Sequence, residues 1–281
     1  MDSWLEPFQF EFFRNGTLAA VIVGGLCGLI GVYIVLRGMS YIGHGLSHAI
    51  FGGAVLSYVM AWNFYVGAGL WGFAAAVLIN QTVRRTKIGA DAAIGVITTA
   101  SFAAGVALIS RYRHFTRNFD AALFGNILGV GREDVWVVAG VAVLAAIVIF
   151  FFYKQLLFAT FDREVARVYG VQTEWLDTLF ALVLAAALIA SMQILGVTLI
   201  AAALVVPAIT ARLLTDSFNR MILISTLIGA LSGLFGMYLS FYVDVASGAT
   251  IVLLQAAVFT LVLAVVSFQK RAARRLMHTH L

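Results

Sequence analysis

Two histidines, His44 and His48, lie four residues apart within YIGHGLSHAIFGGAVLSY, a stretch that otherwise has the apolar character of a membrane-spanning helix. On a helix this spacing puts both imidazoles on one face, about one turn apart, where they can hold one transition-metal ion between them. Ionisable groups within a membrane are costly and usually face a protein interior or an aqueous pathway. We therefore interpret the pair as lining a metal pathway. The alternative is that both rings are neutral and hydrogen-bonded to carbonyl groups of neighbouring helices.

Asp91, which opens the apolar stretch DAAIGVITTASFAAG, is a further candidate for the metal pathway. An aspartate at the start of a helix also caps free N–H groups and complements the helix dipole. The sequence alone leaves both roles open for Asp91.

The same stretches argue against an enzyme. An intramembrane metallo-hydrolase would need a general-base carboxylate beside its histidines, as in HExxH, and HGLSH has none. The chain also has no glycine-rich phosphate loop followed by Lys and Ser or Thr, so we expect it neither to bind nor to hydrolyse nucleotide by itself. No permanently bound cofactor is expected.

The composition indicates an integral membrane protein. Of 281 residues, 62% are hydrophobic and only 11% are charged, whereas charged residues make up about a quarter of a soluble domain. Most basic residues lie at the ends of hydrophobic segments, where orientation in the bilayer explains the net charge of +5 without any nucleic-acid partner. Residues 1–281 are predicted to form a single transmembrane domain in the lipid bilayer.

Hydrophobic segments divide this domain into helices. Because roughly 20 apolar residues cross about 30 Å of hydrocarbon, the chain is predicted to be all-α, with about nine (eight to ten) spans in one bundle. The predicted spans are residues 17–36, 41–61, 64–83, 88–110, 134–154, 176–194, 196–212, 221–242 and 247–268. The block 176–212 also fits one bent span.

Basic residues at the segment ends predict the orientation, because cytoplasmic loops collect Lys and Arg. The stretches expected to be cytoplasmic are Arg84–Lys87, Phe161–Arg167, Arg212 with Arg220, and Lys270–Arg275. With nine spans these four agree, and the N-terminus falls outside. The basic stretch Arg111–Asn118 lands on the outer side and opposes this arrangement.

Several long blocks of the sequence carry a family resemblance. The stretches YIVLRGMSYIGHGLSHAIFGGAVLSY and GADAAIGVITTASFAAGVALIS look like a second-helix signature and a fourth-helix segment. Further matching blocks are LFGNILGVGREDV, the stretch from Phe161 to Leu214, and SGATIVLL. In this order, and over nearly the whole chain, they resemble the permease subunits of bacterial binding-protein-dependent ABC transporters for manganese, zinc and iron.

The resemblance implies a homodimeric pore in the bacterial plasma membrane, which takes a divalent metal from an extracytoplasmic binding protein and releases it to the cytoplasm. It also implies that ATP is hydrolysed on a separate cytoplasmic ATPase dimer. In this family a short cytoplasmic helix couples the permease to the ATPase, and residues 162–170 match it. The matching residues are Asp162, Arg163, Glu164, Arg167, Tyr169 and Gly170. Taken by itself, this segment is polar and solvated, with Gly170 as its helix terminator.

One position departs from the family pattern. Relatives typically have Asp in a D-x-x-x-H motif of the second helix, whereas this chain has His44 there and retains His48. Exchanging a carboxylate for an imidazole removes one negative charge, favours zinc over calcium or magnesium, and weakens discrimination for manganese. The transported ion is predicted to be Mn²⁺ or Zn²⁺, with Fe²⁺ as a further candidate. The alternative function is a secondary metal transporter or channel driven by an ion gradient, which would need neither ATP nor residues 162–170.

Overall fold

The computed structural model describes residues 6–86, 88–112, 123, 125 and 127–278, and all regular structure in this part of the chain is helical. Its long helices are α1 (Glu11–Leu36), α2 (Ser40–Val59), α3 (Phe64–Arg85), α4 (Ala90–Arg111), α6 (Arg132–Phe151), α9 (Thr173–Leu195), α10 (Ile200–Leu214), α11 (Phe218–Val243) and α12 (Ser247–His278). The short elements are η1 (Glu6–Gln9), η2 (Ile127–Gly129), α7 (Tyr153–Phe161) and α8 (Arg163–Val168). The predicted all-α membrane bundle is confirmed.

Each predicted span coincides with one of the long helices. Within the described residues, seven of these helices are long and apolar enough to cross a membrane. The other two are α10, which has only 15 residues, and α2, which has 20 residues but includes two histidines and three serines. The block 176–212 forms two helices because the chain turns at Gly196, whose φ of +77° is a conformation that glycine adopts readily.

Small residues let the helices approach closely, as the glycine-rich stretches of the sequence suggest. A Cβ on Gly28 of α1 would lie 2.4 Å from the carbonyl oxygen of Ser225 on α11, and a Cβ on Gly31 would lie 1.9 Å from that of Leu204 on α10. In lipid, where apolar side chains gain little by meeting one another, such close backbone contact supplies much of the packing.

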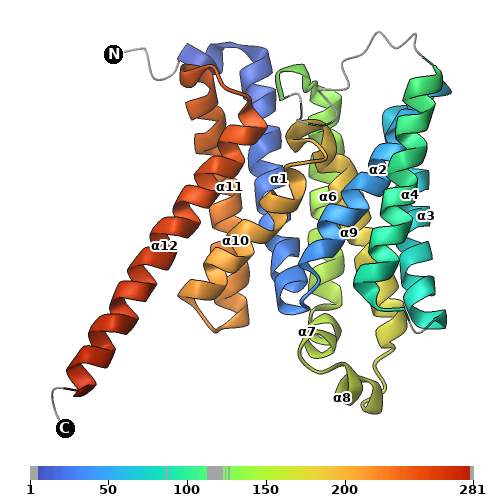
Figure 1. Ribbon diagram of the computed structural model, residues 1–281. Coiled ribbons are helices and arrows are strands. Elements are labelled where there is room, and N and C mark those ends of the chain that lie inside the picture. The colour runs from blue at the N-terminus through green and yellow to red at the C-terminus, as the bar shows by residue number, and fades with distance from the viewer. Residues whose placement is uncertain (1–5, 87, 113–122, 124, 126, 279–281) are drawn as a thin grey trace.

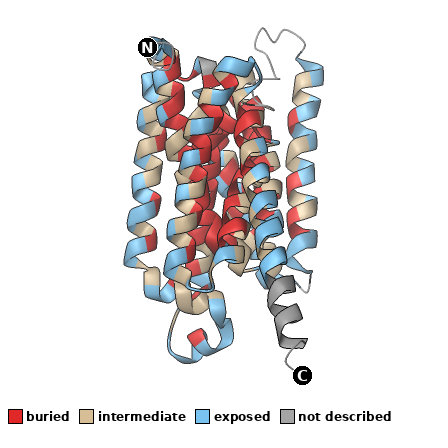
Figure 2. Ribbon diagram, turned by 90° about the vertical axis from the view of Figure 1, so that its left-hand side faces the viewer, coloured by how far each residue is buried: buried red, intermediate tan, exposed pale blue. Residues whose placement is uncertain are grey.

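The helices form two groups around a buried centre. In Figure 1, α2, α3 and α4 lie together at one edge of the bundle, and α10, α11 and α12 lie at the other. Between them run α1 and α9, the most buried of the seven spans, and buried residues concentrate in the middle of the bundle in Figure 2. The histidine-bearing helix α2 is itself largely buried and packs against α3, α4 and α9.

The two ends of the bundle differ in charge. The chain enters α1 at one end and leaves α12 at the other, where α7, α8 and the α3–α4 and α10–α11 connections also lie (Figure 1). This places the described residues of the four basic stretches at one end, and the positive-inside rule predicts that this end is cytoplasmic. Of the opposing stretch Arg111–Asn118, residues 113–118 lie outside the described part of the chain.

Candidate functional site

The two histidines of α2 face each other. His48 Nε2 lies 3.2 Å from His44 Nε2, and the rings are nearly perpendicular, with centroids 4.5 Å apart. Two imidazoles bound to one tetrahedral metal at about 2.0–2.1 Å have their nitrogens about 3.3 Å apart. The same separation is that of a hydrogen bond in which the Nε2–H of one ring donates to the Nε2 lone pair of the other, so the spacing of four residues places the two nitrogens close enough for this bond or for one bound ion.

The surroundings of His48 are apolar on its other side. Its ring packs edge-on against Phe102 of α4, with centroids 5.0 Å apart. Its Nδ1 is buried and has no hydrogen-bond partner among the described residues. The alternative in which both rings are bonded to carbonyls of neighbouring helices therefore finds no support at His48.

Small residues around the pair fix the position of α2. Gly45 leaves no room for a side chain, because a Cβ there would lie 2.3 Å from Ile94 Cγ2 on α4. On the other side, Ser47 Oγ donates a hydrogen bond to the carbonyl oxygen of Val197, at 3.2 Å, in the turn between α9 and α10. The histidine segment is thus held between α4 and the break that follows α9.

Asp91 lies apart from the pair. It is exposed in the first turn of α4, where Gly89 is the N-cap residue and Asp91 makes no side-chain capping bond. Among the described residues no group of three or more His, Cys, Asp or Glu side chains lies close enough to hold a metal ion. The structure brings His44 and His48 together and does not bring Asp91 to them.

The segment 162–170 forms the exposed helix α8. Asp162 caps its N-terminus by accepting a hydrogen bond from Val165 N at 2.9 Å. Gly170, with a φ of +81°, donates to the carbonyl oxygen of Arg167, and Val171 donates to that of Ala166, which is a Schellman ending. Glu164, Arg167 and Tyr169 are all exposed. The helix lies at the cytoplasmic end of the bundle, beyond α9 (Figure 1).

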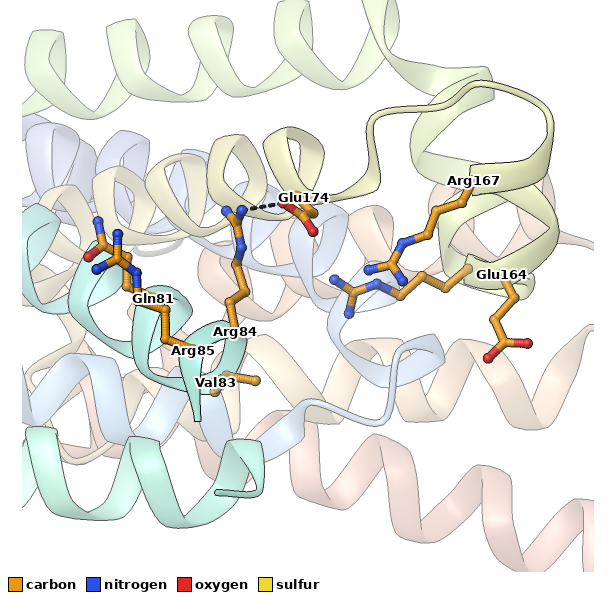
Figure 3. Close-up of a pocket in the computed structure, with 8 residues that line it drawn as sticks. Gln81, Val83, Arg84, Arg85, Glu164, Arg167 and Glu174 are labelled. Carbon is orange, nitrogen blue, oxygen red and sulfur yellow. Dashed lines mark hydrogen bonds and ion pairs between the residues drawn. The ribbon is translucent and has the colours of Figure 1, made fainter. Parts of the chain in front are cut away.

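A basic cleft separates α8 from the end of α3. This cavity of about 570 Å³ is lined by four arginines and two glutamates, and in Figure 3 Arg84 and Arg167 point toward Glu174 while Glu164 is turned away. The lining arginines and glutamates are Arg84, Arg85, Arg163, Arg167, Glu164 and Glu174. Arg84 is paired with Glu174, and the surplus of arginines leaves the cleft positively charged. From the sequence, Arg84 serves only to predict the orientation of the chain in the membrane, whereas the structure places it in this cleft.

A partly buried charge network lies at the same end of the bundle. Arg37 Nη1 donates to Asp177 Oδ1 at 3.1 Å, and Arg163 Nη2 lies 2.5 Å from Asp177 Oδ2. The Arg37 side chain is only 7% exposed, and this burial lowers its pKa, while the Asp177 carboxylate acts in the opposite direction. The available signal was an Asp inside the apolar segment WLDTLFALV, since a charge within a span usually has a partner.

The long, largely apolar helices of the described chain define a multi-pass membrane protein. The chain belongs to the ABC 3 transport family, whose model matches residues 9–266. It is therefore a permease of the bacterial plasma membrane and not an enzyme, and membership of an ABC family supports the ATP-driven reading over the ion-gradient alternative.

Individual relatives agree with this assignment. The chain is 36% identical over 256 residues to the manganese transport system membrane protein MntC of Halalkalibacterium halodurans, covering 91% of this chain and 88% of the relative. It is 35% identical over 255 residues to the chelated iron transport system membrane protein YfeC of Yersinia pestis, covering 91% and 86%. The solved structure of PsaBC from Streptococcus pneumoniae in complex with Fab is similar, with a TM-score of 0.83 and 34% identity over 92% of this chain and 94% of that one.

Proposed function

We propose that this chain is the pore-forming subunit of an importer that passes a divalent transition metal, Mn²⁺ or Fe²⁺, into the cytoplasm. The observation that carries the proposal is the pair of Nε2 atoms 3.2 Å apart on α2. The relatives named for manganese and iron transport support these two ions as cargo. Zn²⁺ fits an all-nitrogen pair at least as well, so we include it among the ions to be tested.

The pair is suited to transient binding. Each neutral imidazole offers one nitrogen lone pair, and the ion keeps water or other ligands in its remaining positions. A translocation site must attract the ion strongly enough for entry and weakly enough for release. Two protein ligands from one chain meet this requirement better than a closed cage. A second copy of the chain would bring a matching pair and complete a homodimeric pore.

A missing sequence motif and an exposed helix suggest which partners this chain needs. Its sequence has no phosphate-binding loop, so we assign ATP hydrolysis to a separate cytoplasmic ATPase dimer. The exposed, capped helix α8 is the segment that we expect to dock on that ATPase, with Glu164, Arg167 and Tyr169 facing it. The basic cleft beside α8 adds a positive surface for acidic residues of the same partner. At the opposite end a metal-loaded binding protein would deliver the ion.

The test is metal uptake by proteoliposomes that contain the permease with its ATPase and binding protein. Loss of hydrogen-bonded partners around a metal ligand already costs about 10–100-fold in affinity, so His48→Ala should lower uptake by at least about tenfold. Leu70→Ala, at a 63% exposed position of α3, is the matched control and should transport normally. If His48→Ala leaves both uptake and metal-stimulated ATPase activity unchanged, the site assignment is wrong. Transport by the chain alone without ATP would instead favour the ion-gradient alternative.

A further inference from the structure

The carboxylate of Asp177 joins two cytoplasmic segments that are distant in sequence. Arg37 directly follows the end of α1, and Arg163 is the first residue of α8. Each guanidinium contacts a different oxygen of Asp177, which lies in the second turn of α9. Asp177 is thus the shared anchor of the α1–α2 turn and of α8.

Arg37 is held from several directions. Besides Asp177, its Nε donates to Thr160 Oγ1 of α7 at 3.0 Å, and its guanidinium carbon lies 4.7 Å from the centre of the Phe180 ring on α9. Its Nη2 is buried without a partner among the described residues. A planar guanidinium clamped in this way follows the groups that hold it, because a rotation would leave further buried donors unpaired.

The turn after Arg37 leads directly into the histidine segment. Gly38 has a φ of +67°, and a Cβ placed there would meet nothing within 4 Å. Ser40 then begins α2, and His44 follows one turn later. Gly38 donates to the carbonyl oxygen of Val35 and Met39 donates to that of Ile34, so a Schellman ending of α1 connects Arg37 to the helix that carries the histidine pair.

We propose that Asp177 is the positioning residue that transmits movement of α8 to α2, and thereby to the histidine pair. The inference rests on the proposed function, in which α8 receives the motion of the ATPase. A displacement of α8 carries Arg163, shifts the Asp177–Arg37 ion pair, and displaces the hydrogen-bonded α1–α2 turn together with the start of α2. The same carboxylate contacts both arginines, so no further element is needed between α8 and the α1–α2 turn.

The ion pair Arg212–Asp216 provides a comparison outside the basic cleft. Asp216 Oδ1 lies 3.2 Å from Nη1 of Arg212, four residues earlier in the chain, so the pair joins no distant segments. The two side chains are 47% and 97% exposed, and exposed pairs contribute little. Asp216→Asn thus removes the same charge as Asp177→Asn without touching the proposed linkage or the residues that line the cleft.

The experiment uses the complete importer in nanodiscs, with spin labels on cysteines introduced at two pairs of positions. The pair Val168 and Leu227 reports movement of α8 against α11, and the pair Ser40 and Leu227 reports movement of α2 against α11. In the parent chain, ATP binding should change both distances. In Asp177→Asn the first change should persist and the second should be lost, and metal uptake per ATP hydrolysed should fall about tenfold, within the range typical of coupling between two sites.

The remaining variants keep the result decisive. Asp216→Asn should behave as the parent chain, and Asp177→Glu should restore most of the uptake per ATP. Arg163→Gln, at a side chain that is 48% exposed, should lose the α2 movement as well and covers the case in which Asp177→Asn does not fold. If α2 still moves in Asp177→Asn, or in Arg163→Gln when the former is unfolded, the linkage is refuted. A parent chain that shows both movements but no metal uptake would instead refute the proposed cargo.

Discussion

Gly24 of α1 and Gly229 of α11 lie backbone against backbone inside the bundle. A Cβ on Gly24 would be 2.1 Å from the carbonyl oxygen of Gly229, and a Cβ on Gly229 would be 2.0 Å from that of Gly24. A methyl group at either position collides with rigid backbone and not with a flexible side chain. The central helix α1 is therefore fixed against α11 by a contact that only glycine permits.

We predict that Gly229→Ala destabilises the protein. Separating the two helices should lower the free energy of unfolding by about 1–3 kcal/mol, as overpacking of a close-packed interior does. Thermal unfolding in detergent measures the effect. Gly140→Ala on α6 is the control, because a Cβ there meets nothing within 4 Å, and it should leave the unfolding temperature unchanged or raise it. Equal unfolding temperatures for the two variants would contradict the close contact.

His44 should decide which ion the pair prefers. We predict that His44→Asp, which restores a carboxylate oxygen and a negative charge, raises uptake of Mn²⁺ relative to Zn²⁺ by about tenfold, equivalent to about 1.4 kcal/mol. Competition between the two ions in reconstituted importer measures the ratio. His44→Asn keeps the shape without the charge and should produce a smaller change. An unaltered ratio in both variants would mean that residue 44 does not bind the ion.

The cap of α8 should matter for assembly with the ATPase. Asp162→Ala removes the acceptor of the Val165 N–H, which costs about 0.5–2 kcal/mol of helix stability, so α8 should fray and bind the ATPase more weakly. Asp162→Asn retains a good cap and should bind nearly as well as the parent chain. Co-purification of the two subunits at graded salt concentrations gives the comparison. Weak binding by both variants would point to the charge of Asp162 and not to its cap.

The sequence predicted the helices well because each span is a local property. Apolar length located all nine long helices of the described chain, although α1 begins at Glu11, six residues before the predicted start, since its first turns are polar. The facing histidines could also be predicted from the sequence, because a spacing of four residues places both side chains on one face of a helix.

Contacts between segments that are distant in the sequence could not be predicted in the same way. Arg37 and Asp177 are 140 residues apart, and nothing local indicates that one is the partner of the other. The separation of Asp91 from the histidines depends on how α4 packs on α2, which hydropathy does not specify. For the block 176–212 the sequence allowed two helices or one bent span, because a glycine within an apolar block is compatible with a bend or with the end of a helix. The structure has two helices, with the break at Gly196.

The most direct test of the account is to locate the ion itself. Crystals of the importer soaked with Zn²⁺ and measured at the zinc absorption edge should show an anomalous peak about 2.0–2.1 Å from Nε2 of both His44 and His48. The peak should disappear in His48→Ala. A peak elsewhere in the bundle, unchanged by that substitution, would contradict the assignment of α2 as the helix that carries the metal site.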